Sequence, residues 1–247
     1  MILIILLIIF VLFLYNFYFN IIEQFCTPPK LNNSDTHIFW TGGYDSTFLL
    51  LQLLKNNFTV QPIYLKGNNL DSSSFFYQRS NVTKELNSMT KITNLIRKHF
   101  PHYKLKNFKV ISCYPVNHKI TKSFEQLYNQ GGSFSRPINQ YERMARVSHY
   151  YKLPFHVGLE KCGTGLDHVS LNKKINSNFN RAITPQGNLW IFKYFRIPVS
   201  HLTKKDMLQI TKQNNWLDII KLTWTCWTPI NGKPCGKCDP CQHMLHI

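Results

Sequence analysis

The stretch HIFWTGGYDST, residues 37–47, joins a short apolar run to a glycine turn and to the first residues of a helical pattern. The apolar run over residues 37–40 is typical of a buried strand, and the spacing of apolar residues from Ser46 to Lys55 predicts a helix. Backbone N–H groups at the start of a helix attract anions, and the pair Gly42 and Gly43 lets the backbone approach a phosphate closely. The stretch therefore predicts a strand–turn–helix unit that cradles phosphate.

Four side chains of this turn add polar groups to the cradle. Thr41, Ser46 and Thr47 carry hydroxyls that donate hydrogen bonds, and Asp45 is suited to orient the loop or to help hold Mg²⁺ on a triphosphate. The alternative is an ordinary tight turn in which Ser46 or Asp45 caps the helix, and the position between strand and helix favours phosphate binding over it. The turn lacks the Gly-x4-Gly-Lys pattern, so kinase and GTPase chemistry is disfavoured.

Strands alternate with helices along the chain from residue 36 onward. Apolar runs predict further strands over 60–65, 110–113 and 155–159, and helical spacing predicts helices over 81–99, 138–151 and 204–214. Residues 161–190 show no such pattern and are predicted to be a loop or insertion. This alternation is typical of βαβ units, so we expect an α/β fold with a doubly wound parallel sheet.

Residues 1–22 form a long apolar run, MILIILLIIFVLFLYNFYFNII. Twenty apolar residues span about 30 Å as a helix, which matches the hydrocarbon core of a bilayer. A cleaved signal peptide is the alternative, but neither a basic start nor a small-residue cleavage site is present. Positive charge begins only at Lys30, so the positive-inside rule predicts a single-pass membrane protein whose folded domain faces the cytoplasm.

The chain is strongly basic. Its 29 Lys and Arg residues outnumber 12 Asp and Glu residues, which gives a formal net charge of +17. Such a balance favours anionic partners such as nucleotides, RNA or an acidic membrane surface. A general drift toward Lys, Asn and Ile explains the charge equally well, because the lysines are scattered along the chain. Charge alone therefore does not identify a nucleic-acid-binding protein.

Four of the seven cysteines cluster near the C-terminal end, with the spacing Cys226-x8-Cys235-x2-Cys238-x2-Cys241. Short Cys-x2-Cys turns supply neighbouring corners of the tetrahedron that Zn²⁺ prefers, and Gly236 eases the turn between two of them. We expect a structural zinc site that staples a small C-terminal lobe. An iron–sulfur cluster and two disulfides are the alternatives.

Two parts of the chain resemble one known family. Residues 41–46, TGGYDS, are similar to the Ser-Gly-Gly-x-Asp-Ser signature of PP-loop ATP pyrophosphatases, with Thr41 in place of the first Ser. The segments PVSHLTKKD (198–206), LTWTCW (222–227) and KPCGKCDPC (233–241) resemble the tail of the 7-cyano-7-deazaguanine (preQ0) synthases of queuosine biosynthesis. The resemblance implies an adenine nucleotide alpha-hydrolase-like, Rossmann-like domain that binds ATP, and zinc on the same four cysteines.

The resemblance also implies a reaction and a set of site residues. The family converts 7-carboxy-7-deazaguanine and ammonia to the nitrile with ATP and Mg²⁺, so the chain is expected to be an ATP-dependent ligase. Asp45, Ser46 and Lys204 are the expected catalytic residues, although Lys204 also fits a solvated lysine at a helix start. The expected nucleotide contacts are Thr41, Gly42, Gly43, Asp45, Ser46, Thr47 and Arg136. The expected organisation is an anchor (1–22), a linker (23–35), an ATP-binding domain (36–200) and a C-terminal helix with the zinc lobe (201–247).

The middle of the chain departs from the family pattern. The family's Gly-Arg-Asn motif corresponds here to Ser135-Arg136-Pro137, and the loop after Gly158 lacks a Tyr-Pro-Asp tripeptide. These differences fall where the family reads its substrate, so two other functions stay open. One is a PP-loop enzyme that thiolates or amidates tRNA, and the other is a degenerate nucleotide-binding zinc module. A homodimer is a further open possibility.

Overall fold

A computed structural model describes residues 8–14, 28–66, 81–112, 117–129, 139–161 and 186–244. Its centre is a five-stranded sheet in which every pairing is parallel. The strands are β1 (Thr36–Phe39), β2 (Val60–Leu65), β3 (Lys109–Ile111), β4 (Phe155–Val157) and β5 (Phe195–Arg196), in the order β3-β2-β1-β4-β5. The chain builds outward from β1 to β3 and then returns to the other side of β1. The predicted parallel α/β sheet is confirmed, and the reversal between β1 and β4 is where such sheets bind ligands.

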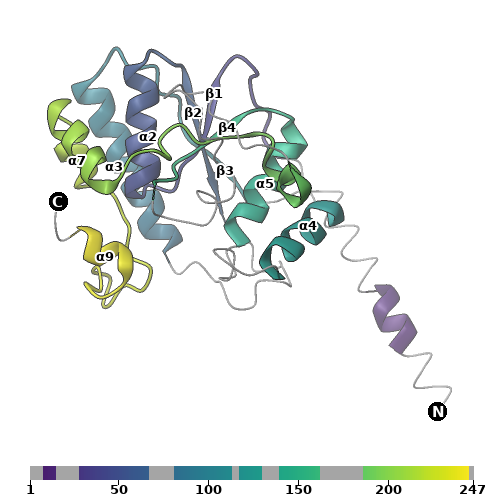
Figure 1. The fold of residues 1–247 in the computed structure, drawn as a ribbon. Coiled ribbons are helices and arrows are strands. Elements are labelled where there is room, and N and C mark those ends of the chain that lie inside the picture. Colours follow the sequence, from purple (N-terminus) through teal and green to yellow (C-terminus); the bar gives the residue numbers. More distant parts are fainter. Residues whose placement is uncertain are drawn as a thin grey trace.

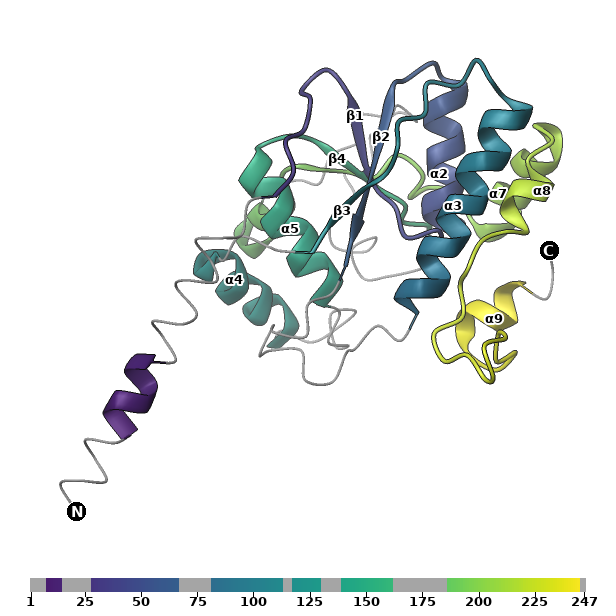
Figure 2. The same ribbon diagram turned by 180° about the vertical axis from the view of Figure 1, so that it is seen from behind.

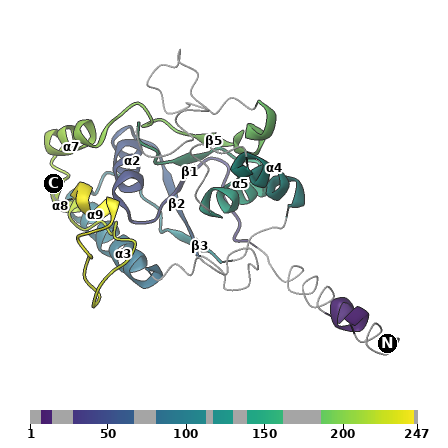
Figure 3. The ribbon, with the colours of Figure 1, turned by 60° about the horizontal axis from the view of Figure 1, so that its bottom comes forward.

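Helices cover both faces of the sheet (Figures 1 and 2). One face carries α2 (Tyr44–Lys55), α3 (Val82–His99), α7 (Lys204–Gln213) and α8 (Leu217–Ile220). The opposite face carries α4 (His118–Asn129), α5 (Asn139–Tyr151) and the 3₁₀ helix η3 (Gly187–Phe192). The short helix α9 (Asp239–Met244) lies in a C-terminal lobe beyond α3, and Figure 3 shows the sheet from the end near this lobe.

The two faces of the sheet have separate apolar cores, because alternate residues of a strand point to opposite sides. Ile38 and Trp40 pack with α2, α3 and α8 on one side. Phe39 packs with α4 and α5 on the other, where its ring stacks on Phe155 with centroids 4.6 Å apart. Helix α2 is buried almost throughout, so the helix that follows the glycine turn is the central element of its layer.

Most predicted elements are present within one or two residues of their predicted ends. The structure adds α4, β5 and α8, which sequence patterns did not indicate. β5 has two residues and α8 has four, so both are too short to show a period. The 3₁₀ helix begins at Gly187, within the predicted loop over 161–190, and ends at Phe192. Residues 162–185 of that loop lie outside the described ranges. The division into an anchor, a linker and two further parts stays a prediction.

The predicted transmembrane anchor over residues 1–22 is wrong as a description of this structure. Among the residues that the structure describes, no helix is long and apolar enough to cross a membrane. Residues 8–14 are helical, but seven residues span only about 10 Å against the ~30 Å of hydrocarbon. Residues 1–7 and 15–22 lie outside the described ranges. The predicted single-pass membrane localisation, which depended on this helix, is corrected with it.

His37 makes the stability of the fold depend on pH. Its side chain lies in β1 with 1% exposure, its Nε2 has no hydrogen-bond partner among the described residues, and burial lowers its pKa from 6.5 to about 4. The unfolded chain therefore binds a proton at this histidine below pH 6.5 that the folded chain refuses until about pH 4. We expect the free energy of unfolding to fall by up to about 3 kcal/mol between these pH values.

Urea unfolding of the wild type and of His37→Gln between pH 7 and pH 4 measures this effect. The variant is less stable at neutral pH but has a shallower loss on acidification, since glutamine does not titrate. Equal slopes in the two proteins would show that His37 does not carry the pH dependence.

Candidate functional site

The glycine turn lies between the end of β1 and the start of α2, above the carboxyl edge of the sheet. Gly42 has a φ of +71°, a conformation that favours glycine. A Cβ at this position would lie 2.9 Å from Met89 Cγ and 3.1 Å from the carbonyl oxygen of Glu85, both on α3. The turn therefore needs glycine both for its backbone angle and for its close approach to α3.

Polar groups of the turn bond to one another. The Ser46 hydroxyl lies 3.3 Å from the Gly43 carbonyl oxygen and 3.4 Å from the Thr41 hydroxyl. The Thr41 N–H donates to Ser46 Oγ, and the Gly43 N–H donates to Thr41 Oγ1, each at 3.4 Å. Thr47 differs, because its hydroxyl is fully buried and accepts a 3.0 Å hydrogen bond from Trp40 Nε1. Its hydroxyl is thus turned into the core and away from the other hydroxyls of the turn.

The end of β4 supports the turn from the neighbouring strand. A Cβ on Gly158 would lie 2.7 Å from the Ser46 nitrogen and 2.8 Å from the Asp45 carbonyl oxygen. Only a residue without a side chain can occupy this position while the first turn of α2 stays in place. The strands on either side of the reversal point in the sheet thus meet at the same turn.

A charged cluster stands beside the turn. Lys204 Nζ is hydrogen-bonded to Asp45 and lies 3.3 Å from Glu160 Oε1, and it sits 4.8 Å from the centre of the Tyr44 ring. The side chains of Asp45 and Lys204 are about one third and one quarter exposed, at 32% and 26%, so a solute can reach them. The fold therefore brings together two predicted catalytic residues that are 159 positions apart in the sequence.

The start of α7 determines where Lys204 lies. Thr203 and Asp206 form a capping box, in which the Asp206 N–H donates to Thr203 Oγ1 at 3.2 Å and the Thr203 N–H donates to Asp206 Oδ2 at 2.9 Å. Hydrogen bonds from the Thr203 backbone and hydroxyl lower the pKa of Asp206. The box makes Thr203 the N-cap and Lys204 the first residue of the helix, which places the Lys204 side chain next to Asp45.

A cleft opens next to Thr41 at the carboxyl ends of β1 and β2. Its walls include Trp40 and Leu65 on the sheet side and Gln140, Arg143 and Met144 on α5. Sequence analysis missed Gln140 and Arg143. The sequence signal that could have pointed to Arg143 was its charge, because it lies within the helix that was expected to cover the sheet. Arg136, the predicted nucleotide contact from this region, lies outside the described ranges.

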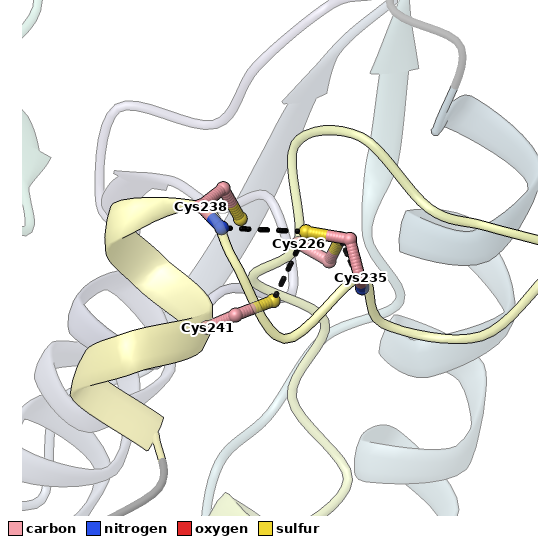
Figure 4. Close-up of side chains that lie close together, drawn as sticks. All are labelled: Cys226, Cys235, Cys238 and Cys241. Atoms are coloured by element: carbon pink, nitrogen blue, oxygen red, sulfur yellow. Dashed lines mark hydrogen bonds between the residues drawn. The ribbon is translucent and has the colours of Figure 1, made fainter.

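The four predicted metal ligands converge in the C-terminal lobe (Figure 4). All four sulfur atoms lie within 4.8 Å of one another, and the Cys235 and Cys241 sulfurs are 3.9 Å apart. Tetrahedral zinc with bonds of about 2.3 Å requires sulfur atoms about 3.8 Å apart. Gly236, with a φ of +69°, makes the turn after Cys235, and all four cysteines are free thiols. This donor set can hold a zinc ion, and the paired disulfides are not formed.

Hydrogen bonds prepare one of these sulfurs to bind a cation. The Thr228 hydroxyl and the N–H groups of Lys237 and Cys238 donate to Cys235 Sγ at 3.4–3.5 Å, and they lower the pKa of Cys235 to about 5. Burial instead raises the pKa of Cys226 and Cys241. Because the thiolate is the metal ligand, zinc must displace protons from those two residues.

A parallel sheet, a glycine turn at a helix start and a four-cysteine lobe are together the features expected of an α/β protein of the PP-loop class. Residues 173–245 match the model of the family described as "Queuosine biosynthesis protein QueC". The 7-cyano-7-deazaguanine synthases of two strains of Leptospira biflexa serovar Patoc are each 32% identical to this chain over 72 residues. These matches support the expected resemblance to the 7-cyano-7-deazaguanine synthase family over the C-terminal part of the chain.

The matches cover a limited part of each protein. The aligned 72 residues are 29% of this chain and 27% of the length of each relative. The family match contains Lys204 and all four cysteines, and it does not contain the glycine turn at residues 41–43. The turn enters the site through the fold, which places it against the matched segment.

Replacing Gly42 tests the close approach between the turn and α3. We expect Gly42→Ala to lower the free energy of unfolding by about 1–3 kcal/mol more than Gly187→Ala does, because only Gly42 adds a steric clash. Gly187 is the matched control, since its φ is also positive at +50° and a Cβ there meets nothing within 4 Å. Urea denaturation measures both, and equal losses would exclude a packing requirement at Gly42.

Metal analysis tests the lobe. We expect one zinc per purified chain by mass spectrometry and no visible absorption of an iron–sulfur cluster. Cys241→Ser should lose the metal, whereas Cys113→Ser, outside the cluster in sequence, should retain it. Zinc retention should also decline on acidification, as protons compete for the buried thiols. Iron in the purified chain together with visible absorption would instead identify the site as an iron–sulfur cluster.

Proposed function

We propose that this protein is an ATP-dependent ligase that uses its glycine turn to bind the pyrophosphate of ATP and activates a carboxylate by adenylation. The observation that carries the proposal is the cluster at the turn, where Asp45, Ser46 and Lys204 meet. The family match supports the same conclusion, because the relatives that match over the C-terminal part are 7-cyano-7-deazaguanine synthases.

The residues of the cluster have distinct roles in this proposal. The backbone N–H groups at the start of α2 and the hydroxyls of Thr41 and Ser46 hold the β- and γ-phosphates. Lys204 carries a positive charge next to the turn, where charge develops as pyrophosphate departs. Asp45 orients Lys204 before ATP binds and helps to hold Mg²⁺ on the bound nucleotide. Glu160, on the other side of Lys204, keeps the ammonium group over the turn.

The cleft beside the turn adjoins the proposed phosphate site. Leu65, Gln140, Arg143 and Met144 line it next to Thr41. The Trp40 ring packs with α2, α3 and α8 on the other face of the sheet. Arg143 brings a positive charge to the side of the turn, which suits a phosphate or carboxylate group held there.

The proposed substrates are ATP, 7-carboxy-7-deazaguanine and ammonia. The carboxylate attacks the α-phosphorus of ATP, which releases pyrophosphate and forms an acyl-adenylate. Ammonia then displaces AMP to give the amide, and a second adenylation of the amide oxygen allows its loss with AMP as the nitrile forms. The protein's part is to hold ATP and acid together and to exclude water from the adenylate.

AMP release by the full chain tests the proposal. With ATP, Mg²⁺, ammonium and 7-carboxy-7-deazaguanine, we expect AMP that depends on the acid and a nitrile product by mass spectrometry. Asp45→Ala should lower the rate by about 100-fold or more, because it removes the carboxylate that orients Lys204 and helps to hold Mg²⁺ on the nucleotide. Asp218→Ala is the matched control, since Asp218 is 77% exposed and pairs with Lys221 at 3.9 Å.

Other outcomes point elsewhere. AMP formation with a different acid would keep the ligase and change its substrate. ATP binding without AMP release from folded, zinc-loaded protein, with every carboxylate tried, would contradict the ligase and favour a nucleotide-binding zinc module.

A further inference from the structure

The segment that leads into the cysteine cluster runs along the back of the glycine turn. The Trp224 N–H donates to the Gly42 carbonyl oxygen at 2.9 Å. A Cβ on Gly43 would lie 3.7 Å from the Trp224 carbonyl oxygen, so the two backbones are in contact. Figure 2 shows this part of the chain descending from α8 beside α3 to the lobe that carries α9. The turn and the metal lobe therefore share one stretch of backbone.

Helix α3 holds this segment at two points. Near the middle of the helix, the buried Ser88 hydroxyl donates to the Leu222 carbonyl oxygen at 2.5 Å and lies 3.4 Å from the Gly42 carbonyl oxygen. At the start of the helix, the amide of Asn81 donates to the carbonyl oxygens of Cys226 at 2.8 Å and of Trp227 at 3.0 Å. Asn81 and Ser88 are each 6% exposed, so water does not readily replace these bonds.

The bond from Trp224 to Gly42 determines where the turn presents its donors. A peptide group is planar, and its C=O and N–H point in opposite directions. Because Gly42 C=O faces Trp224, the N–H of Gly43 in the same plane faces away from Trp224 and toward the mouth of the turn, where it meets Thr41 Oγ1. A rotation of this peptide would move a phosphate donor, and Trp224 prevents the rotation.

The cysteine cluster fixes the other end of the same segment. Cys226 lies two residues after Trp224, and its sulfur accepts a 3.2 Å hydrogen bond from the Cys235 N–H. With a metal bound, Cys226 is tied to the three ligands that follow it in the chain. The apolar side chains of the described part of the lobe bury little surface, since Trp227 is 55% and Ile230 54% exposed, so a bound metal is its main expected restraint.

We propose that the four-cysteine lobe positions the phosphate-binding turn. Metal binding at Cys226 holds segment 222–227 against α3. That segment sets the orientation of the Gly42–Gly43 peptide and hence the affinity for ATP. Asn81 and Ser88 are the positioning residues of this connection. The choice of ATP as the ligand rests on the proposed function, whereas the connection itself rests on the hydrogen bonds.

Amide hydrogen exchange of the full, zinc-loaded chain tests the connection without any nucleotide. Asn81→Ala and Ser88→Ala should each speed exchange of the amides of residues 41–47 by about three- to tenfold, as expected for one lost hydrogen bond. Ser148→Ala is the matched control, because Ser148 is also a fully buried helical serine whose hydroxyl donates to a backbone carbonyl, that of Ala145, at 2.9 Å. It should leave these amides unchanged, even where it lowers global stability by a similar amount.

Removal of zinc by a chelator should have the same effect on residues 41–47 in the wild type. Unchanged exchange at the turn, either after zinc removal or in both variants with zinc still bound, would overturn the proposal. Should one variant fail to fold, the other variant and the zinc-depleted wild type still decide the matter.

Calorimetric titration with ATP then tests the consequence for binding. The zinc-loaded wild type and Ser148→Ala should bind ATP equally, and Asn81→Ala, Ser88→Ala and the zinc-depleted wild type should bind about three- to tenfold more weakly or worse. Failure of the zinc-loaded wild type to bind ATP would contradict the proposed function alone, because exchange at the turn still reports the connection. Equal ATP affinity in all forms would overturn the positioning role.

Discussion

The close approach of backbone at Gly42 is the constraint on which the site depends. Helix α3 lies against its Cα and Trp224 bonds to its carbonyl oxygen. The approach of α3 requires that residue 42 has no side chain, and the backbone there has a positive φ of +71°. β4 meets the neighbouring first turn of α2 through Gly158, which is equally restricted. Two positions without side chains therefore allow β1, β4, α2, α3 and the C-terminal segment to meet within one small volume.

This convergence also explains why the charges of the site are arranged as they are. Asp45 lies in α2, which follows β1, and Glu160 follows β4. Lys204 is the first residue of α7, which follows β5. One cation between two carboxylates leaves the cluster with a net negative charge, while the backbone amides of the turn attract anions. Under the proposed function, a nucleotide that enters brings a cation or displaces Lys204 from one carboxylate, as a magnesium complex would.

Much of this arrangement follows from local sequence. The apolar run at 37–40, the two glycines and the cysteine spacing each report a structure formed by neighbouring residues, so the strand, the turn and the cysteine cluster were predictable. The contacts of Asn81, Ser88 and Trp224 were not, because hydrogen bonds to backbone carbonyls place no demand on the residue type of the acceptor and so leave no motif. Arg143 was missed for a related reason, since a charged residue in a covering helix usually faces water.

The apolar run at residues 1–22 shows the opposite failure. Composition alone predicted a membrane span, whereas among the described residues only 8–14 form a helix in this region, and it is too short to span. Hydropathy measures how readily a segment leaves water, and it does not by itself report the length of a helix.

The hydrogen bond between Trp224 and Gly42 has a consequence for how the protein is made. It joins residues that are about 180 positions apart, and a ribosome adding about 5–20 residues per second needs roughly 10–35 s to synthesise the chain between them. During that time a nascent chain has the glycine turn but lacks the segment that orients it. The turn thus reaches its final geometry only after the cysteine lobe has been synthesised, which ties the first βα unit to the completion of a distant part of the chain.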